Sequence, residues 1–387
     1  MRITIVNGFF LPVPPVSGGS TEKSWYYLGQ EFAARGHTVT NISRQWRGFP
    51  NDEEQNGVRY LRYRGKDHNR ELWMNLLDDL IWSWRVYRNL PRADIIIVNA
   101  LALPMWLGRF RPEAGKVIVM TGRMPKGQYK RYNHLARILA PSSFVRDKVA
   151  AENPKLAPTI RVTGYPINWQ ILSHEGVTRH PQLPAMQSGE ITLGFVGRIN
   201  EEKGLMLLVD ALRIVSKAPG LPLWRLMLCG PVDIARGGSG GAFRGQLGNK
   251  LSEFLHSDRF NIIDPQFNER VLAGFYRRIA IFCYPSLAEQ GETFGVAVAE
   301  AMAAGAVPVV SKLACFTDFV RHEQNGLVFD HRAPDAAAQF AAALERLLRD
   351  AALRQRLSDA ARQDSRRYDY PVYAEALLAD FTELTRR

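Results

Sequence analysis

The sequence has few cysteines, and it lacks an apolar run long enough to cross a membrane. Its 387 residues include three cysteines, Cys229, Cys283 and Cys315, which lie far apart and form no CxxC pair. This pattern offers neither a disulfide framework nor a zinc site, so we expect a protein of the reducing cytosol. The longest apolar run, residues 95–108, contains a proline. It also falls short of the roughly 20 residues that a transmembrane helix needs.

Three further motifs are missing, and each absence disfavours a class of protein or site. The N-terminal run MRITIVNGFF reads as a strand and lacks the basic, apolar, small-residue order of a signal peptide. No G-x-G-x-x-G follows that strand, which disfavours a dinucleotide dehydrogenase. No DxD triplet or other set of carboxylates and histidines has metal-ligand spacing, and Asp78-Asp79 in a helical pattern reads as a solvated face. We therefore expect no metal requirement.

Acidic residues are scarce in the first half of the chain. Residues 1–168 contain 25 Lys and Arg against 13 Asp and Glu, a net charge of +12, which equals that of the whole chain. Within this half, residues 105–148 hold ten basic residues and two acidic ones. Charge of one sign favours an anionic partner, although a solvated basic face is the plain alternative. No nucleic-acid-reading motif is present, so we expect an anionic membrane surface or a phosphorylated acceptor and no nucleic acid.

β-Branched runs alternate with helical patterns along the chain, which predicts doubly wound parallel sheets. In the first half, strands are expected at residues 2–6, 38–42, 94–99, 117–120, 138–140 and 159–162, and an amphipathic helix over 70–90. In the second half, a helix is expected over 204–216 and strands at 191–197, 224–229, 260–263, 279–283 and 307–310. We predict two Rossmann-like domains facing a cleft, because open α/β sheets bind ligands beyond the carboxyl ends of their strands.

The pattern breaks in a turn-rich stretch at residues 171–189, which we interpret as the domain linker. The N-terminal domain then covers residues 1–170 and the C-terminal domain residues 190–367. An amphipathic helix over 368–387 is expected to pack back onto the first domain. The glycine-rich segment 235–250 reads as a mobile surface loop.

The strongest chemical signal lies in residues 285–311, PSLAEQGETFGVAVAEAMAAGAVPVVS. This segment predicts a strand, a loop, an Ala-rich helix and another strand, with Glu292 in the loop and Glu300 near the second helical turn. Either carboxylate alone could cap the helix or complement its dipole. The amides of Phe294 and Gly295 at the helix start can hold a phosphate, and the two carboxylates then suit the hydroxyls of a sugar and a ribose.

This segment resembles the E-x7-E region of the GT-B glycosyltransferases of family 4, with a Glu-x-Phe-Gly start and an Ala-Met-x-x-Gly-x-Pro-Val-Val ending. Other segments match that family in the same order: Gly18-Gly19 before a helix, RGHTV at 35–39, FVGR at 195–198, EKG at 202–204 and NGLV at 325–328. The resemblance covers most of the chain and is strongest over 190–330. It implies a GT-B fold, a UDP- or GDP-sugar as donor, retention of configuration and no covalently bound cofactor.

The resemblance also implies roles for individual residues. Glu292 would hold the hydroxyls of the donor sugar and Glu300 the ribose. Arg198 and Lys203 would bind the diphosphate and stabilise its charge as the glycosidic bond breaks. A lysine at a helix start opposes the dipole, which is easier to understand if an anion lies beside it. The other donor contacts would come from both domains, at Gly18, Gly19, Gly230, Phe267, Thr293, Phe294 and Gly295.

One position departs from the family pattern. Members often carry a histidine just after the strand that corresponds to residues 117–120, and this sequence has Thr-Gly-Arg-Met there. Arg123 could take over and meet an acidic sugar or an acceptor phosphate, or it could point to solvent. His134 reads as a helix-surface residue and not as a replacement.

The leading interpretation is a retaining glycosyltransferase of the cytosol, acting at the inner membrane face on an acidic or lipid-linked glycan acceptor in surface-polysaccharide or lipopolysaccharide assembly. Two alternatives stay open. A GT-B-fold sugar-nucleotide epimerase or phosphorylase is the first, and the epimerase would need acid and base side chains that the sequence hardly offers. A non-catalytic sugar-nucleotide-binding subunit is the second, favoured by the missing histidine and disfavoured by the intact segment 285–311.

Overall fold

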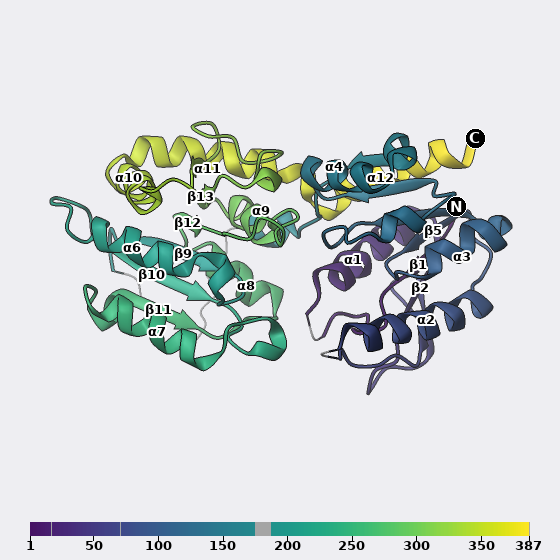
Figure 1. The fold of residues 1–387 in the computed structure, drawn as a ribbon. Helices are drawn as coiled ribbons and strands as arrows, with labels where there is room; N and C mark the ends of the chain where they lie inside the picture. The colour runs from purple at the N-terminus through teal and green to yellow at the C-terminus, as the bar shows by residue number, and fades with distance from the viewer. Residues whose placement is uncertain (17, 70, 175–186, 387) are drawn as a thin grey trace. The chain divides into compact units, whose positions relative to one another are not determined.

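The computed structural model describes residues 1–16, 18–69, 71–174 and 187–386, and the chain forms two compact units (Figure 1). The first unit comprises Met1–Pro166 and Tyr370–Arg387, and the second comprises Ile167–Asp369. The boundary between the units thus falls after Pro166. Residues 175–186 of the predicted linker lie outside the described residues.

The first unit is built on an eight-stranded sheet with the order β3-β4-β2-β1-β5-β6-β7-β8. At one edge β3 pairs antiparallel with β4, and the other pairings are parallel. Central strands such as β1 and β5 consist largely of Ile and Val, because a strand covered on both faces needs apolar side chains in both directions. The strands span Arg2–Val6 (β1), Thr38–Arg44 (β2), Asp52–Gln55 (β3), Val58–Tyr63 (β4), Ile95–Val98 (β5), Lys116–Met120 (β6), Arg137–Ala140 (β7) and Ile160–Val162 (β8).

Helices cover both faces of this sheet. Helices α2, α3 and α4 contribute to one apolar core that includes Val6 of β1. On the opposite face, α1 packs against Ile5 at Gly29, and α12 packs on α1 through Phe32 and Phe381. These helices span Ser20–Ala34 (α1), Leu72–Asn89 (α2), Leu103–Phe110 (α3), Ser143–Glu152 (α4) and Tyr370–Arg386 (α12).

The second unit has a parallel six-stranded sheet with the order β11-β10-β9-β12-β13-β14. The chain builds from β9 outward to β11 and then adds β12 to β14 on the other side of β9. The order therefore reverses between β9 and β12, and open α/β sheets bind ligands at the carboxyl ends of strands at such a switch point. The strands span Ile191–Val196 (β9), Trp224–Cys229 (β10), Phe260–Ile263 (β11), Ile281–Tyr284 (β12), Val307–Ser311 (β13) and Leu327–Phe329 (β14).

The helices of the second unit pack on one another, and α10 and α11 are in contact. Helix α6 contacts α7 and α10, whereas α5 contacts α8 and α9, and α9 contacts α11. The helices span Trp169–Ser173 (α5), Leu205–Val215 (α6), Gly240–Ser252 (α7), Glu269–Tyr276 (α8), Val296–Ala303 (α9), Ala336–Arg349 (α10) and Ala351–Ser365 (α11). Figure 1 shows α10 and α11, in yellow-green, beside β13 and away from α7.

Two sequence-based expectations are wrong. The glycine-rich segment 235–250 is not a loop throughout, because α7 begins at Gly240 and buries apolar residues at four-residue spacing, Phe243, Leu247 and Leu251. The pair Asp78-Asp79 does not form a solvated face, because both side chains are buried on α2. In both cases a tertiary contact outweighs the local preference of the residues.

Candidate active site

The residues that the sequence singles out in the second unit follow the carboxyl ends of its strands. Arg198 and Lys203 come after β9, and Glu292 comes after β12, so these three flank the point where the strand order reverses. Gly230 follows β10 directly, and Glu300 lies in α9. The topology thus gathers the predicted donor residues of this unit at one edge of its sheet.

Lys203 and Glu292 form a buried ion pair. The Nζ atom of Lys203 lies 2.6 Å from Oε2 of Glu292, and the two side chains are 6% and 11% exposed. The ammonium group also lies 5.3 Å from the centroid of the Tyr284 ring. Buried charges are costly unless they are paired and hydrogen-bonded, so this contact offsets the cost of burying the two side chains.

A close approach of two loops creates this pair. The amide of Leu287, after β12, donates to the carbonyl of Glu202, after β9, over 2.8 Å. Gly204 has a left-handed backbone with φ of 67°, and a Cβ at this position would overlap the carbonyl of Pro285. Glycine is required here both by conformation and by space, which explains why it follows Lys203 directly.

Two buried tyrosines hold the two glutamates. The hydroxyl of Tyr284 donates to Glu292 over 3.1 Å, and that of Tyr276 donates to Glu300 over 2.9 Å. Burial is the main cause that raises the pKa of each tyrosine well above its usual value, and the charge of the neighbouring glutamate is the second cause. Both phenols therefore stay protonated at physiological pH and act as donors. Ser286 donates a further, longer hydrogen bond to Glu292 over 3.4 Å.

Arg198 is more accessible than Lys203 and pairs with its own loop. Its Nη2 atom lies 2.7 Å from Oε1 of Glu202, and both side chains are 43% exposed. A Cβ on Gly237 would overlap the Arg198 side chain, so the glycine-rich segment begins directly against it. An exposed pair of this kind contributes about 0–1 kcal/mol, so a phosphate can displace Glu202 from the guanidinium at little cost.

The start of α9 is fixed by packing of its aromatic residue. Phe294 is 1% exposed and stacks on Phe319 with ring centroids 4.6 Å apart, so its side chain serves the core. Gly295 is the N-cap of α9 and makes no side-chain capping hydrogen bond. Thr293, between Glu292 and Phe294, is half-buried.

Phe267, one of the predicted donor contacts, is 53% exposed after β11. The guanidinium of Arg236 lies 5.2 Å from the centroid of its ring. An accessible aromatic ring with a cation on one face can stack on a planar ligand with the other.

In the first unit, the predicted glycine turn lies beside a buried carboxylate. Gly18 and Gly19 have left-handed φ values of 88° and 98°, and Gly19 is the N-cap of α1. Glu22 in the first turn of α1 is 9% exposed and contacts Gly19. Burial raises the pKa of Glu22, and the positive charge of Arg123 opposes this rise. Arg123 is exposed itself and is close enough to Glu22 to act on it electrostatically.

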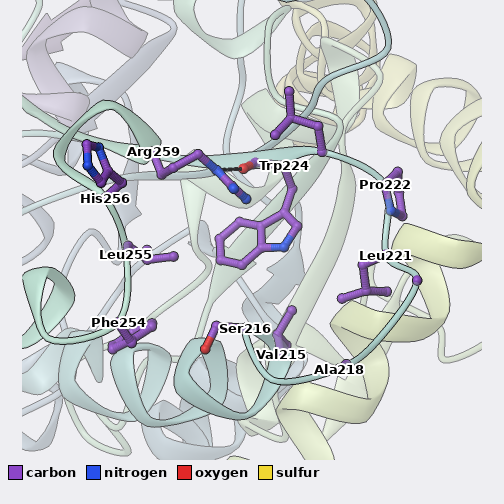
Figure 2. Close-up of a pocket in the computed structure, with 12 residues that line it drawn as sticks. Val215, Ser216, Ala218, Leu221, Pro222, Trp224, Phe254, Leu255, His256 and Arg259 are labelled. Atoms are coloured by element: carbon purple, nitrogen blue, oxygen red, sulfur yellow. Dashed lines mark hydrogen bonds between the residues drawn. The ribbon is translucent and has the colours of Figure 1, made fainter.

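A cavity of about 490 Å³ lies at the opposite edge of the sheet of the second unit (Figure 2). Trp224, the first residue of β10, lines it together with Arg259, whose guanidinium lies 5.0 Å from the centroid of the indole. The lining contains none of the predicted donor residues. Because it lies at the amino ends of the strands, this cavity is distinct from the candidate site.

Within the described ranges, no group of three or more His, Cys, Asp or Glu side chains could hold a metal ion. No helix of the same ranges has the length and apolar character of a membrane span. The expected absence of a metal requirement stays a prediction.

Residues 178–364 match the family described as glycosyl transferases group 1. The second unit is a glycosyl transferases group 1 domain. The chain is 33% identical over 283 residues to the phosphatidyl-myo-inositol mannosyltransferase of Mycobacterium tuberculosis H37Rv, a match that covers 72% of this chain and 63% of the relative. It is 30% identical over 198 residues to the D-inositol 3-phosphate glycosyltransferase of Rhodococcus erythropolis, covering 51% and 42%. The matched region thus spans less than two thirds of the length of these relatives.

Solved structures establish the fold over the whole chain. Sucrose-phosphate synthase from Thermosynechococcus elongatus matches with a TM-score of 0.75 and 19% identity, covering 100% of this chain and 99% of that one. Anabaena HepE in complex with UDP and glucose matches with a TM-score of 0.71 and 14% identity, covering 99% and 100%. The predicted GT-B fold with two parallel α/β domains is therefore confirmed.

Sequence reasoning missed three residues that contact the predicted site. Tyr284 ends the strand IFCY, where a polar group in a fully apolar run is a usable signal. Tyr276 ends α8, far from any motif, and no sequence signal identifies it. Glu22 follows the glycine turn by three residues, as an acid in the first turn of a helix often does, so its spacing alone indicates a cap and not a site.

Proposed function

We propose that this protein is a glycosyltransferase that moves a sugar from a nucleotide diphosphate sugar to an acceptor hydroxyl. The buried Lys203–Glu292 pair at the switch point carries the proposal. It sets a cation suited to a diphosphate beside a carboxylate suited to sugar hydroxyls. The group 1 family match of the same unit and the two named transferase relatives support the same reaction.

We infer that the two domains divide the substrates. Arg198, Lys203 and the start of α9 would hold the diphosphate, Glu292 the sugar and Glu300 the ribose. Gly230 and Phe267 would meet the base, and Gly18 and Gly19 would contribute from the first domain. UDP- and GDP-sugars are the proposed donors. The bond from the anomeric carbon to the β-phosphate oxygen breaks, and the cations stabilise the departing diphosphate.

Transfer would proceed with retention of configuration. The acceptor hydroxyl attacks from the face that the diphosphate leaves, and a phosphate oxygen of the leaving group accepts the acceptor's proton. No protein general base is then needed. The anomeric configuration of the product, read by NMR, tests this step, because an inverted product would contradict it.

We propose an acceptor that carries a negative charge, on a lipid-linked or otherwise acidic glycan. Residues 1–168 supply the whole net charge of the chain, +12. The names of both kinds of relative specify an acceptor with an inositol joined to phosphate. A phosphate next to the accepting ring would suit this basic domain and the exposed Arg123. Surface-polysaccharide assembly at the inner membrane face is the proposed setting.

The experiment that tests the proposal removes both charges of the buried pair together. Either single alanine variant would leave an unpaired buried charge and cost about 3–5 kcal/mol, so a loss of activity could reflect unfolding. The double variant Lys203→Met/Glu292→Gln avoids this. We expect it to stay folded and to lose sugar transfer, measured as nucleotide diphosphate released only when acceptor is present.

The chain offers a matched control in the same unit. Arg225 and Glu190 form a second buried ion pair, 2.8 Å apart with side chains 6% and 0% exposed, at the amino ends of β9 and β10. Arg225→Met/Glu190→Gln repeats the chemical change away from the site and should keep transfer. Wild-type turnover in the Lys203/Glu292 double variant would overturn the proposal.

The donor is identified by thermal shift with UDP-, GDP-, ADP- and TDP-sugars. A bound donor raises the apparent stability by mass action, by about 2.7 kcal/mol at a concentration of 100 Kd. The double variant should lose this shift for the matching donor. A protein that binds a nucleotide sugar but releases no diphosphate with any acceptor would be a binding subunit and not a transferase.

A further inference from the structure

Helix α2 turns its apolar side to solvent and its acidic residues to the protein. Of the sixteen large apolar side chains exposed in the described ranges, seven lie on this one helix, with 42–70% of their surface exposed: Leu72, Trp73, Leu76, Leu77, Leu80, Ile81 and Trp84. Their spacing, in adjacent pairs four residues apart, covers one side of a helix. We refer to these seven side chains as the α2 face.

Hydrogen bonds from the buried side fix the rotation of the helix. Asp79 accepts from the amides of Leu101 and Ala102 over 3.1 and 2.8 Å, at the start of α3. Asp78 accepts from Lys66 over 2.6 Å. Rotating α2 to bury its apolar side would break these bonds and expose Trp82, which is 1% exposed. The outward direction of the α2 face is therefore a specified feature of the fold.

The apolar surface continues onto the neighbouring helix. Trp84 stacks on Tyr87 with ring centroids 5.8 Å apart, and its edge meets Trp106 of α3 at 6.2 Å. Phe110, at the end of α3, is 61% exposed. In Figure 1, α2 lies at the margin of its own unit, with α3 beside it and no other labelled helix of that unit covering its outer side. Contiguous exposed apolar surface of this kind marks an interaction site.

The exposed charges around the α2 face are mostly positive, and Glu71, the N-cap of α2, is an exposed acid at its start. Arg88, Arg92 and Arg109 are exposed. Between residues 72 and 111, the described acidic residues are Asp78 and Asp79, which are buried, and Asp94, which pairs with Arg2 at 2.9 Å. The surface therefore combines apolar and tryptophan side chains with a basic rim, the composition of helices that lie in a membrane interface.

We propose that the α2 face docks on an anionic lipid bilayer, with α2 lying along the interface and the arginines meeting the headgroups. A second copy of the chain fits less well, because a two-fold contact would bring the three exposed arginines of each copy together with only Glu71 as an exposed acid of the helix start. A bilayer with anionic headgroups satisfies both components, since apolar side chains enter the acyl boundary and each cation gains from the negative surface potential. The inference extends the proposed function, because it brings the enzyme to a lipid-linked acceptor.

The test measures vesicle binding by the full-length protein, with no transfer step. Sucrose-loaded vesicles of phosphatidylcholine alone, or mixed equally with phosphatidylglycerol, are sedimented with the wild type and with Leu76→Glu/Leu80→Glu. The wild type should bind the anionic vesicles, and the variant should bind at least about tenfold more weakly, because two charges then enter the apolar layer. Arg88→Gln/Arg109→Gln should weaken binding and make it less dependent on salt.

A control substitution tests whether the added charge must lie on the α2 face to weaken vesicle binding. Val372 on α12 is 42% exposed, the same as Leu80, and lies in the same unit. Val372→Glu should leave vesicle binding unchanged. The thermal shift that the nucleotide sugar causes should be the same in the α2 variants as in the wild type. This result would show that the variants fold and keep the donor site. A failure of the proposed function would remove that shift and leave the vesicle result intact.

Two results would overturn the proposal. Equal sedimentation of the wild type and Leu76→Glu/Leu80→Glu with anionic vesicles is the first. The second is a wild type that fails to bind vesicles and forms a dimer, by analytical ultracentrifugation, that the variant does not form. The latter would assign the α2 face to a second copy.

Discussion

Glu292 and Glu300 are equally buried, each with 9% of the whole residue exposed, but they have different neighbours. Glu292 contacts the ammonium of Lys203 and the hydroxyl of Tyr284, whereas Glu300 accepts from Tyr276. A hydrogen bond to a charged group contributes about 1.5–3 kcal/mol, so each phenol restricts the orientation of one carboxylate. Because the two tyrosines come from different elements, β12 and α8, the two carboxylates can be perturbed separately.

We expect Tyr276→Phe and Tyr284→Phe to affect different parts of the donor. Tyr276→Phe should weaken binding of the free nucleotide diphosphate by about tenfold, since 1.4 kcal/mol corresponds to one decade and Glu300 is assigned to the ribose. Tyr284→Phe should leave that affinity nearly unchanged and lower kcat with the sugar donor. Calorimetry with the nucleotide and steady-state kinetics with the donor measure the two effects. The same change in both variants would contradict separate roles for the glutamates.

Glu22 gives a prediction of pH dependence. Burial raises its pKa above the ordinary value of 4.5, so the folded protein favours the neutral acid. Stability should therefore fall as the pH rises from 4.5 through the raised pKa of the folded state. Glu22→Gln should be more stable than the wild type at neutral pH and lose this advantage in acid, measured by denaturant unfolding. Arg123→Gln removes the positive charge that lowers the pKa of Glu22, so the loss of stability with rising pH should be larger in this variant. Parallel pH profiles of stability in the wild type, Glu22→Gln and Arg123→Gln would contradict this account.

At the scale of elements, the sequence predicts what local patterns specify. The apolar strands β1, β9 and β10 lie within a residue of their expected ranges, because both faces of these strands are covered. The edge strand β3 reads DEEQ and carries no apolar signal, and its pairing with β4 depends on the rest of the sheet. The direction of α2 follows from Asp79, which accepts hydrogen bonds from two amides just before α3, a contact that no window of sequence reveals. In the site, motifs predicted Lys203 and Glu292 but not the phenols that hold the glutamates.

The loop after β9 provides a test at this scale. Gly204→Ala should lower the melting temperature of the second unit and reduce donor binding, because the added Cβ would overlap the carbonyl of Pro285 and separate the two loops. Overpacking costs about 1–3 kcal/mol in addition to the left-handed strain. Gly220 has nearly the same φ, 68°, and a Cβ there would meet only the Arg349 side chain at an ordinary contact distance of 3.8 Å, so Gly220→Ala isolates the strain. Equal losses in the two variants would show that the close approach is unimportant.

At the scale of the whole molecule, the first unit is assembled from both ends of the described chain. Phe381 of α12 packs on Phe32 of α1, and Asp380 forms an ion pair with Arg137, 2.6 Å apart. The second unit is continuous in sequence, and its two ends meet, because the amide of Ile167 donates to the carbonyl of Tyr368 over 2.8 Å. The apolar pattern of the sequence predicted the last helix. It did not predict the contact of this helix with α1, because that contact depends on the tertiary structure.

We expect a fragment of residues 1–166 to be poorly folded, because Arg137, only 5% exposed, would lose its counter-charge and Phe32 its cover. Joining residues 370–387 to it through a short Gly/Ser linker should restore cooperative thermal unfolding. Asp380→Ala in the joined fragment is the control, and it should lower the melting temperature. A cooperative transition in residues 1–166 alone would contradict this dependence on α12.

The position of α12 also sets an order of events during synthesis. A ribosome releases residues 1–166 first, yet α1 lacks the helix that packs on it, α12, until residue 386 has emerged. The continuous second unit can close before that moment, so the usual N-terminal-first order of domain folding is reversed here. Until then the apolar face of α1 needs protection. A chaperone such as a ribosome-bound holdase should therefore bind nascent chains that are stalled before residue 370.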